Sequence, residues 1–340
     1  CFFVLGGLGQ KCESPKKSSE QSCFDNSAFG TLYKLCRARH GLFLVNPDSL
    51  IGWYLDHFGD WEHPSYSWFR ELGAEGNVVI DVGANLGAHT VPLAKLVGPT
   101  GTVVAIEPQR TIHQLLNANV ALNSLDNVHT IHAACSSQGG GTLEIPEVDQ
   151  RVWQERPEGW KEGQPGNPAW IKRKEFHFNW GMMSLGENAK TDPVHALASR
   201  HVSVPVITLD QVALLKKLQR CDLIKLDVEG MEQQVLQGAT RILAEFKPAL
   251  FFEYNHNALK KENVEGAKQQ QVLLPWLRSL GYELFHFHHA TVTRDNFHNA
   301  DLSQFKYANY KESNVIAVHK SKFKLLAVLA QSLPRIQTVE

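Results

Sequence analysis

The stretch NVVIDVGANLGAH, residues 77–89, carries the clearest structural pattern in the chain. Its β-branched residues indicate a short buried strand, which ends at the carboxylate of Asp81. A Gly-x-Asn-x-Gly turn follows at residues 83–87, and a helix is expected over residues 86–97. A strand, a glycine turn and a helix N-terminus meet at the carboxyl edge of a parallel sheet, where open α/β folds bind ligands.

A second carboxylate, Glu107, ends the next predicted strand, residues 101–106. An acidic residue roughly 20 positions beyond such a turn is placed to accept hydrogen bonds from both hydroxyls of a ribose. The two strand ends together therefore predict a site for a cofactor that carries adenosine.

The middle of the turn indicates which cofactor this is. A dinucleotide fingerprint reads G-x-G-x-x-G/A, and its second glycine lets the backbone approach a pyrophosphate. Here Gly83 and Ala88 fit the first and last positions, but Asn85 occupies the middle. The Asn85 side chain obstructs a diphosphate, and Asp81 repels one while suiting an ammonium group. S-adenosylmethionine has an ammonium group and no phosphate, so it is the predicted cofactor, with an NAD-linked Rossmann oxidoreductase as the alternative.

From residue 77 onward the predicted elements alternate between strand and helix. This alternation is typical of an α/β fold with a parallel sheet and crossover helices. The predicted strands cover 77–81, 101–106, 128–133, 201–206, 222–226, 248–253, 282–288 and 314–319, and the predicted helices cover 86–97, 110–123, 208–219, 230–245 and 266–280.

The composition along the chain predicts four regions. They are an N-terminal segment at 1–27 (a linker or a targeting remnant), an aromatic-rich helical cap at 28–76, a catalytic domain at 77–320 with an insertion at 139–200, and a C-terminal helix and tail at 321–340. The cap is predicted to hold one strand, Gly41–Val45, and two short helices. The insertion is rich in tryptophan, which predicts a hairpin and loop folded over the active site. Gly181–Leu185 within it is read as a strand edge or as a lid.

The bulk composition limits the partners of the chain. Its formal net charge of -1 and pI near 7.0 argue against an extended nucleic-acid or anionic-membrane surface. The apolar opening, residues 1–9, is far shorter than the ~20 residues that span a bilayer.

The cysteines bear on localisation. Cys1, Cys12, Cys23 and Cys36 crowd the N-terminal region, which favours disulfides in an oxidising compartment. No Asn-x-Ser/Thr sequon occurs, which weakens a secretory assignment. The cytoplasm and the lumen of the secretory pathway both stay open.

A second segment, DLIKLDVEGME at residues 222–232, has the same sequence pattern as the first strand and its turn. Its apolar run ends at Asp227 and Glu229, just before a predicted helix. In a doubly wound sheet this strand neighbours the first, so both acids are expected to face the reactive end of the cofactor. They are candidates for a general base toward a substrate hydroxyl or amine, for ligands of a divalent cation, or for helix caps.

Two further polar clusters are candidates for a metal site. Glu253, Asn255 and His256 follow the next strand and are placed to complete a base or a metal site with Asp227. His286, His288 and His289 lack a carboxylate or cysteine at ligand spacing, so we interpret them as strand-end residues. No dedicated metal ligand is predicted.

Together these segments resemble the FkbM family of S-adenosylmethionine-dependent methyltransferases. The matching segments are Val79–Gly87, Gly98–Pro108, Asn119–Val128, Gly181–Leu185, Val206–Asp210, Leu223–Glu232, Val235–Ala239 and Gly281–Tyr282. The resemblance implies a class I, Rossmann-like fold with a seven-stranded sheet whose last strand is antiparallel. It implies cofactor contacts at Asp81, Gly83, Ala84, Asn85, Gly87, Glu107 and Pro108, with Ala134 and Cys135 flanking the adenine and Asp227 beside the methyl group.

The leading hypothesis is therefore O-methylation of a hydroxyl on a small molecule or glycan, with Asp227 and Glu229 as candidate bases. A magnesium-assisted form of the same transfer is the close variant. The other candidate functions are an NAD-linked oxidoreductase and a binding module that keeps the fold without catalysis. Because members of the family methylate varied sugar and natural-product hydroxyls, the resemblance leaves the acceptor open.

Overall fold

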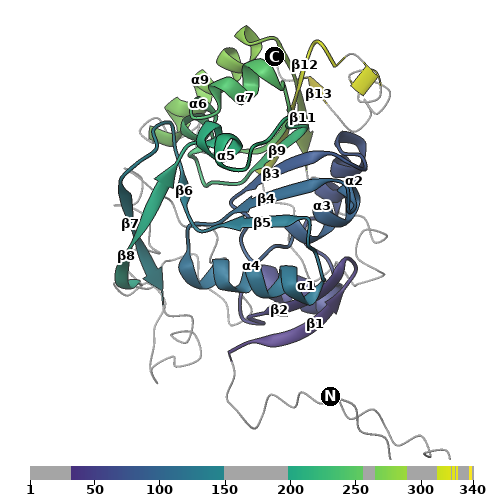
Figure 1. The fold of residues 1–340 in the computed structure, drawn as a ribbon, viewed down its shortest axis with the longest axis vertical. Helices are drawn as coiled ribbons and strands as arrows, with labels where there is room; N and C mark the ends of the chain where they lie inside the picture. Colours follow the sequence, from purple (N-terminus) through teal and green to yellow (C-terminus); the bar gives the residue numbers. More distant parts are fainter. Residues whose placement is uncertain are drawn as a thin grey trace, which may run out of the picture. The chain divides into compact units, whose positions relative to one another are not determined.

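The structure, a computed structural model, describes residues 32–148, 198–255, 265–288, 312–322, 324–325, 327 and 337–338. Its main sheet has the strand order β13-β11-β12-β10-β9-β3-β4-β5 (Figure 1). The strands are β3 (Val78–Val82), β4 (Thr102–Ile106), β5 (Val128–Ile131), β9 (Leu223–Leu226), β10 (Ala249–Asn255), β11 (Tyr282–His288), β12 (Glu312–His319) and the two-residue β13 (Gln337–Thr338).

The direction of the strands confirms the predicted fold class. The pairs that join β5, β4, β3, β9 and β10 are all parallel. β12 pairs antiparallel with both β10 and β11, so β11 runs in the common direction. The seven-stranded α/β sheet with an antiparallel last strand is therefore as predicted, and β13 adds a short strand outside β11.

Helices cover both faces of this sheet. Helices α2 (His63–Leu72) and α3 (Thr90–Val97) pack on one face, and α5 (Leu209–Leu215), α6 (Glu232–Gln237), α7 (Thr240–Glu245) and α9 (Glu265–Ser279) pack on the other. Because both faces are buried, the strands are apolar throughout rather than alternating. Val79 of β3 packs on the α3 side and Ile80 on the α5 side, so Asp81 also points toward α3.

One predicted helix is split in two. The sequence predicts one helix over 230–245, but α6 ends before Gly238 and α7 begins at Thr240. At Gly238 the backbone passes very close to the segment that contains Ser136, because an added Cβ would lie 2.2 Å from the Ser136 carbonyl oxygen. The carboxylate of Asp210 then accepts hydrogen bonds from the N–H groups of Arg241 and Ile242 in the first turn of α7.

The N-terminal cap contains a hairpin as well as two helices. Strand β2 (Gly41–Val45) and helices α1 (Leu50–Phe58) and α2 agree with the prediction, but strand β1 (Lys34–Ala38), which pairs antiparallel with β2, was not predicted. Only Cys36 and Ala38 of β1 are buried, so its apolar pattern is too short to recognise. Cys36 is a free, buried thiol, and Cys1, Cys12 and Cys23 lie outside the described residues.

A small second sheet holds the two ends of the insertion. Its order is β6 (Ala134–Cys135), β8 (Ala198–Ile207) and β7 (Thr142–Val148), and β7 and β8 pair antiparallel. Glu147 of β7 lies 2.8 Å from the guanidinium of Arg110, the first residue of helix α4 (Arg110–Leu122). The base of the insertion is thereby attached close to Glu107. Gly181–Leu185 lies outside the described residues.

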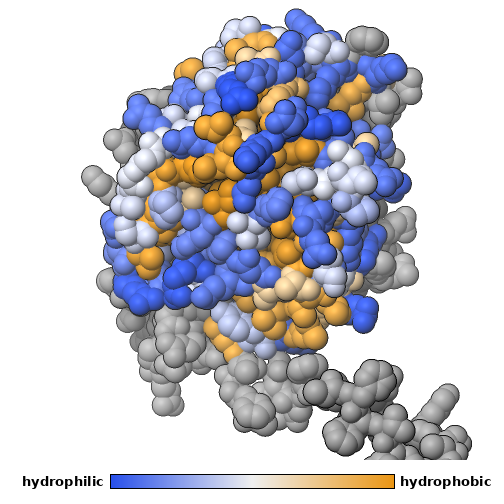
Figure 2. All heavy atoms as spheres, viewed as in Figure 1, coloured by the Kyte–Doolittle hydropathy of each residue, from blue (hydrophilic) through white to orange (hydrophobic). Residues whose placement is uncertain are grey.

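Five large apolar side chains are exposed among the described residues: Leu122, Leu214, Leu215, Val272 and Leu280. Figure 2 shows apolar residues gathered in a band over α5 and its neighbours, and Leu214 and Leu215 of α5 are 66% and 67% exposed. Among the described residues no helix combines the length and the apolar character that crossing a membrane requires.

Two asparagines of α4 attach the hairpin to the domain. Asn119, fully buried, accepts a hydrogen bond from the Leu44 N–H and donates to the carbonyl oxygens of Leu44 and Leu86. Asn123 pairs in the same way with both backbone groups of Leu42. These side chains take the place of a neighbouring strand along β2.

Asn119→Ala is therefore expected to destabilise the protein by about 3 kcal/mol, because it leaves the buried carbonyl oxygen of Leu86 and the partly buried backbone groups of Leu44 without these hydrogen bonds. Chemical denaturation measures this change. Asn117→Ala, at an exposed position of the same helix, is the control and should cost less than about 1 kcal/mol. Equal effects of the two substitutions would contradict the role given to Asn119.

Candidate active site

The turn after β3 is held by hydrogen bonds within the turn and to the end of β4. The N–H groups of Gly83 and Ala84 both donate to the carbonyl oxygen of Ile106, and that of Gly87 donates to Ala84. The Asn85 N–H donates to Glu107 Oε2 at 3.0 Å, and the Leu86 N–H donates to the Asn85 side chain at 2.7 Å. All five N–H groups of the turn therefore already donate hydrogen bonds to other groups of the protein. The turn has no free donor with which to bind a phosphate.

Three residues of this turn, Gly83, Asn85 and Gly87, have positive φ angles, and that of Gly87 is 95°. Gly83 has a φ of 72°, and a Cβ added to it would lie 1.9 Å from the carbonyl oxygen of Asp227. Glycine is therefore required because the turn packs directly against the end of β9. Asn85 has a φ of 50°, a conformation that asparagine tolerates better than most residues.

Glu107 is held with both carboxylate oxygens in place. Oε1 accepts a hydrogen bond from the Gln109 N–H at 2.8 Å, and Oε2 accepts the one from Asn85. The residue is 4% exposed. Burial raises the pKa of Glu107 to about 7, although the two backbone hydrogen bonds act in the opposite direction.

Asp81 lies beneath the turn rather than in the pocket. It is 0% exposed, its Oδ2 accepts a hydrogen bond from the hydroxyl of Thr90 at 2.6 Å, and its Oδ1 lies 3.2 Å from the ammonium of Lys225. The alternation of β3 turns this side chain toward α3. A contact between Asp81 and the ammonium group of the cofactor therefore stays a prediction that the pocket lining does not support.

The loop after β9 carries the candidate catalytic acids. Asp227 is 40% exposed, and its Oδ2 lies 3.7 Å from the Lys225 ammonium. Glu229 and Gly230 have φ values of 53° and 94°, so the chain turns sharply here. The buried carboxylate of Glu232 accepts a hydrogen bond from the Gly230 N–H at 3.2 Å, which stabilises this turn. Burial raises the pKa of Glu232 to about 7.

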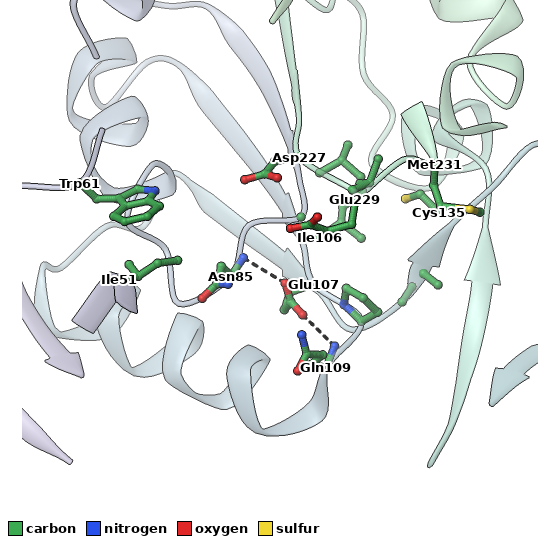
Figure 3. Close-up of a pocket in the computed structure, with 16 residues that line it drawn as sticks. Ile51, Trp61, Asn85, Ile106, Glu107, Gln109, Cys135, Asp227, Glu229 and Met231 are labelled. Atoms are coloured by element: carbon green, nitrogen blue, oxygen red, sulfur yellow. Dashed lines mark hydrogen bonds between the residues drawn. The ribbon is translucent and has the colours of Figure 1, made fainter. Parts of the chain in front are cut away.

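These segments surround one pocket, which encloses about 760 Å³ including open solvent at its mouth (Figure 3). Figure 3 shows Trp61 and Ile51 at one end, Cys135 and Met231 at the other, and Asn85 and Glu107 between them, below Asp227 and Glu229. The other lining residues are Val82, Gly83, Ile106, Pro108, Gln109, Ala133, Ala134 and Val228.

Most of the site residues predicted from the sequence meet in this pocket. Gly83, Asn85, Glu107, Pro108, Ala134, Asp227 and Glu229 line it, whereas Asp81, Ala84 and Gly87 do not. Ala84 is 3% exposed and packs with Leu116 of α4. Gly87 faces the same helix, since a Cβ added to it would lie 3.0 Å from Leu116.

Several residues of the site were not predicted. Ile51 of α1 and Trp61, which follows α1, reach the pocket from the N-terminal cap, and Met231 reaches it from the β9 loop. The aromatic richness of the cap was a signal for Trp61, but nothing in the sequence separates this ring from those that pack in the core. Trp61 is held by an edge-to-face contact with Tyr54.

One group of acids is spaced closely enough to share a cation. Among the described residues, Asp227, Glu229 and Glu253 each offer a carboxylate oxygen, and these oxygens lie within 4.8 Å of one another. The backbones of Asn255, His286 and His288 are described, but their side chains are not, and His256 and His289 lie outside the described residues.

The residues of the pocket fit S-adenosylmethionine better than a dinucleotide. A pyrophosphate needs free N–H donors, and the turn has none left. Glu107 has both oxygens oriented and lone pairs to spare for two ribose hydroxyls. Ala134, Cys135 and Met231 form an apolar end suited to an adenine ring.

The sheet with its antiparallel last strand, and the carboxylate that follows β4, agree with the fold and the site that the resemblance to the FkbM family implies. Sequence comparison narrows the class: residues 81–284 match the family described as the Methyltransferase FkbM domain. The chain belongs to this family, and it is a methyltransferase that uses S-adenosylmethionine. A comparison with curated proteins gave no match.

Solved structures align with the chain at low similarity. Methyltransferase FkbM from Methylobacillus flagellatus aligns at 15% identity and a TM-score of 0.39, over 75% of this chain and 50% of that one. The O-methyltransferase from Bacillus cereus, in complex with SAH, aligns at 10% identity and a TM-score of 0.42, over 77% of this chain and 83% of that one. Similarity this low adds nothing to the family assignment.

Proposed function

We propose that the protein transfers a methyl group to a hydroxyl of a small molecule or glycan, with Asp227 as the general base. The observation that carries the proposal is the position of Asp227. Its carboxylate is partly exposed in the pocket, across from Trp61 and above Asn85 (Figure 3). Glu229 lies beside it and is the second candidate.

The pocket supports one orientation of the cofactor. Glu107 is suited to the ribose, and the apolar end at Cys135 and Met231 is suited to the adenine. The reactive end then falls between Asn85, Asp227 and Trp61. Bound S-adenosylmethionine supplies an electrophilic methyl group there. Asp227 accepts the proton of the acceptor hydroxyl, and the pocket walls hold that oxygen in line, since an in-line displacement depends mainly on positioning.

The side chains that line the pocket also indicate the charge and polarity of the acceptor. Trp61 and Ile51 offer an apolar wall opposite the acids, and no Lys, Arg or His belongs to the part of the lining that the structure describes. Carboxylates close to the reactive end repel a negatively charged acceptor. An uncharged hydroxylated molecule with one apolar face suits this arrangement, because it can stack on Trp61 and direct a hydroxyl to Asp227.

A metal-assisted form of the transfer is the second candidate. The spacing of Asp227, Glu229 and Glu253 favours it, since carboxylate oxygens are the ligands that Mg²⁺ prefers. In this form the three acids would hold the cation, and the cation would lower the pKa of the acceptor hydroxyl.

One experiment tests the reaction and separates the two forms. The protein is incubated with S-adenosylmethionine and a panel of neutral sugars, lipids and phenols, and mass spectrometry is used to detect the gain of one methyl. We expect methylation of a hydroxyl. Activity that is lost in EDTA and restored by Mg²⁺ would select the metal-assisted form, and activity insensitive to EDTA would select Asp227 acting alone. Methyl transfer to nitrogen would overturn the proposal.

A further inference from the structure

Lys225 is a buried cation between the turn after β3 and the loop after β9, with its side chain only 4% exposed. Its ammonium faces oxygens from three segments. The carbonyl oxygen of Gly83 accepts its hydrogen bond at 3.0 Å, Asp81 Oδ1 lies 3.2 Å away, and Asp227 Oδ2 lies 3.7 Å away. These oxygens belong to the end of β3, the cofactor turn and the loop after β9.

The sheet register explains why the three segments meet at one ammonium. Lys225 is the direct partner of Asp81 across the parallel pair β3–β9, so both side chains emerge on the same face of the sheet. Asp227 follows two residues later, where the strand has ended. Burial lowers the pKa of Lys225, but Asp81 and Asp227 outweigh it and raise the pKa above its ordinary value, so the group is charged.

We propose that Lys225 is a positioning residue that holds the cofactor turn and Asp227 at a fixed separation. The Gly83 carbonyl is the first backbone acceptor of the turn, and Asp227 is the group that faces the reacting hydroxyl. A single ammonium that contacts both makes the binding segment and the catalytic segment move as one unit. The role of Asp227 in this statement rests on the proposed function, whereas the connection of the two segments does not.

The simpler role for Lys225 is to neutralise Asp81. Without Lys225 the Asp81 carboxylate, which is 0% exposed, would be a buried charge with no counter-charge, and this is strongly destabilising. Lys225→Met alone would therefore lower stability whether Lys225 positions the two segments or only neutralises Asp81. The double variant Asp81→Asn with Lys225→Met removes both charges and so separates the two roles. In that variant the amide that replaces the Asp81 carboxylate still accepts the Thr90 hydroxyl, and the Asp227 N–H still donates to the carbonyl oxygen of Val82. The ammonium that joins the Gly83 carbonyl oxygen to the Asp227 side chain is absent.

The test compares Lys225→Met, the double variant and Lys34→Met with the native protein. Lys34 forms an exposed ion pair with Asp56 at 2.8 Å, away from the pocket, and serves as the control. The measurements are the melting temperature, the Kd of S-adenosylhomocysteine by calorimetry, and the amide hydrogen exchange of residues 83–87 and 227–231. None of them needs the acceptor, so they report on Lys225 even if the hydroxyl acceptor is wrong.

We expect the double variant to regain most of the melting temperature that Lys225→Met loses. It should still bind S-adenosylhomocysteine about tenfold more weakly than the native protein, and both segments should exchange faster. Native affinity and native exchange in the double variant would show that Lys225 only neutralises Asp81.

Discussion

Glu107→Ala is expected to weaken the binding of S-adenosylhomocysteine by about 100-fold or more, because two ribose hydroxyls lose a charged acceptor and each such bond contributes about 1.5–3 kcal/mol. The substitution also removes the acceptor of the Asn85 and Gln109 N–H groups, which loosens the turn. Calorimetry measures the change. Glu245→Ala, which removes an exposed acid of α7, is the control and should leave the affinity unchanged. An affinity within a few-fold of native in Glu107→Ala would show that the ribose lies elsewhere.

The raised pKa of Glu107 adds a pH dependence to this prediction. In the protein without cofactor the carboxyl titrates near pH 7, and its ionised form is the one that accepts two hydroxyl hydrogen bonds. Affinity should therefore level off only well above pH 7, where the carboxyl is fully ionised, and should fall as the pH decreases through 7, approaching about tenfold per pH unit. Glu107→Gln does not titrate, so its weaker binding should be flat over the same range. A flat profile in the native protein would contradict the assignment.

Asp227→Asn is expected to lower kcat by about 100- to 10,000-fold, the range that a positioned general base contributes, while the affinity for S-adenosylhomocysteine changes only a few-fold. The amide keeps the shape of the side chain but cannot accept the proton of the acceptor hydroxyl. Steady-state kinetics on the acceptor found in the methylation screen measures this loss.

Glu229→Gln is the matched comparison for Asp227→Asn. Because Glu229 lies beside Asp227 in the same pocket, it experiences a similar environment. A much smaller loss in Glu229→Gln would assign the base to Asp227, and the reverse order would assign it to Glu229. Similar large losses in both variants, together with loss of activity in EDTA, would favour the metal-assisted form.

Much of the fold was predictable because strand and turn signals are local. β11 has the bounds that its sequence predicts, and β3 and β4 agree within one residue. The helix after the cofactor turn begins at Thr90 rather than at residue 86, because the residues before it complete the hydrogen-bonded turn. The split between α6 and α7 escaped prediction, since it depends on the approach of Ser136 from a distant segment.

The sequence by itself determined the class of cofactor and the edge of the sheet that binds it. The signals were Asn85 in place of a glycine and a carboxylate at the end of each of two strands. Each can be recognised from a few neighbouring residues. Only the tertiary structure decided that Asp81 is buried against Lys225 and that Trp61 reaches the pocket from the cap. These contacts depend on strand register and on the packing of distant segments, which local propensity does not encode.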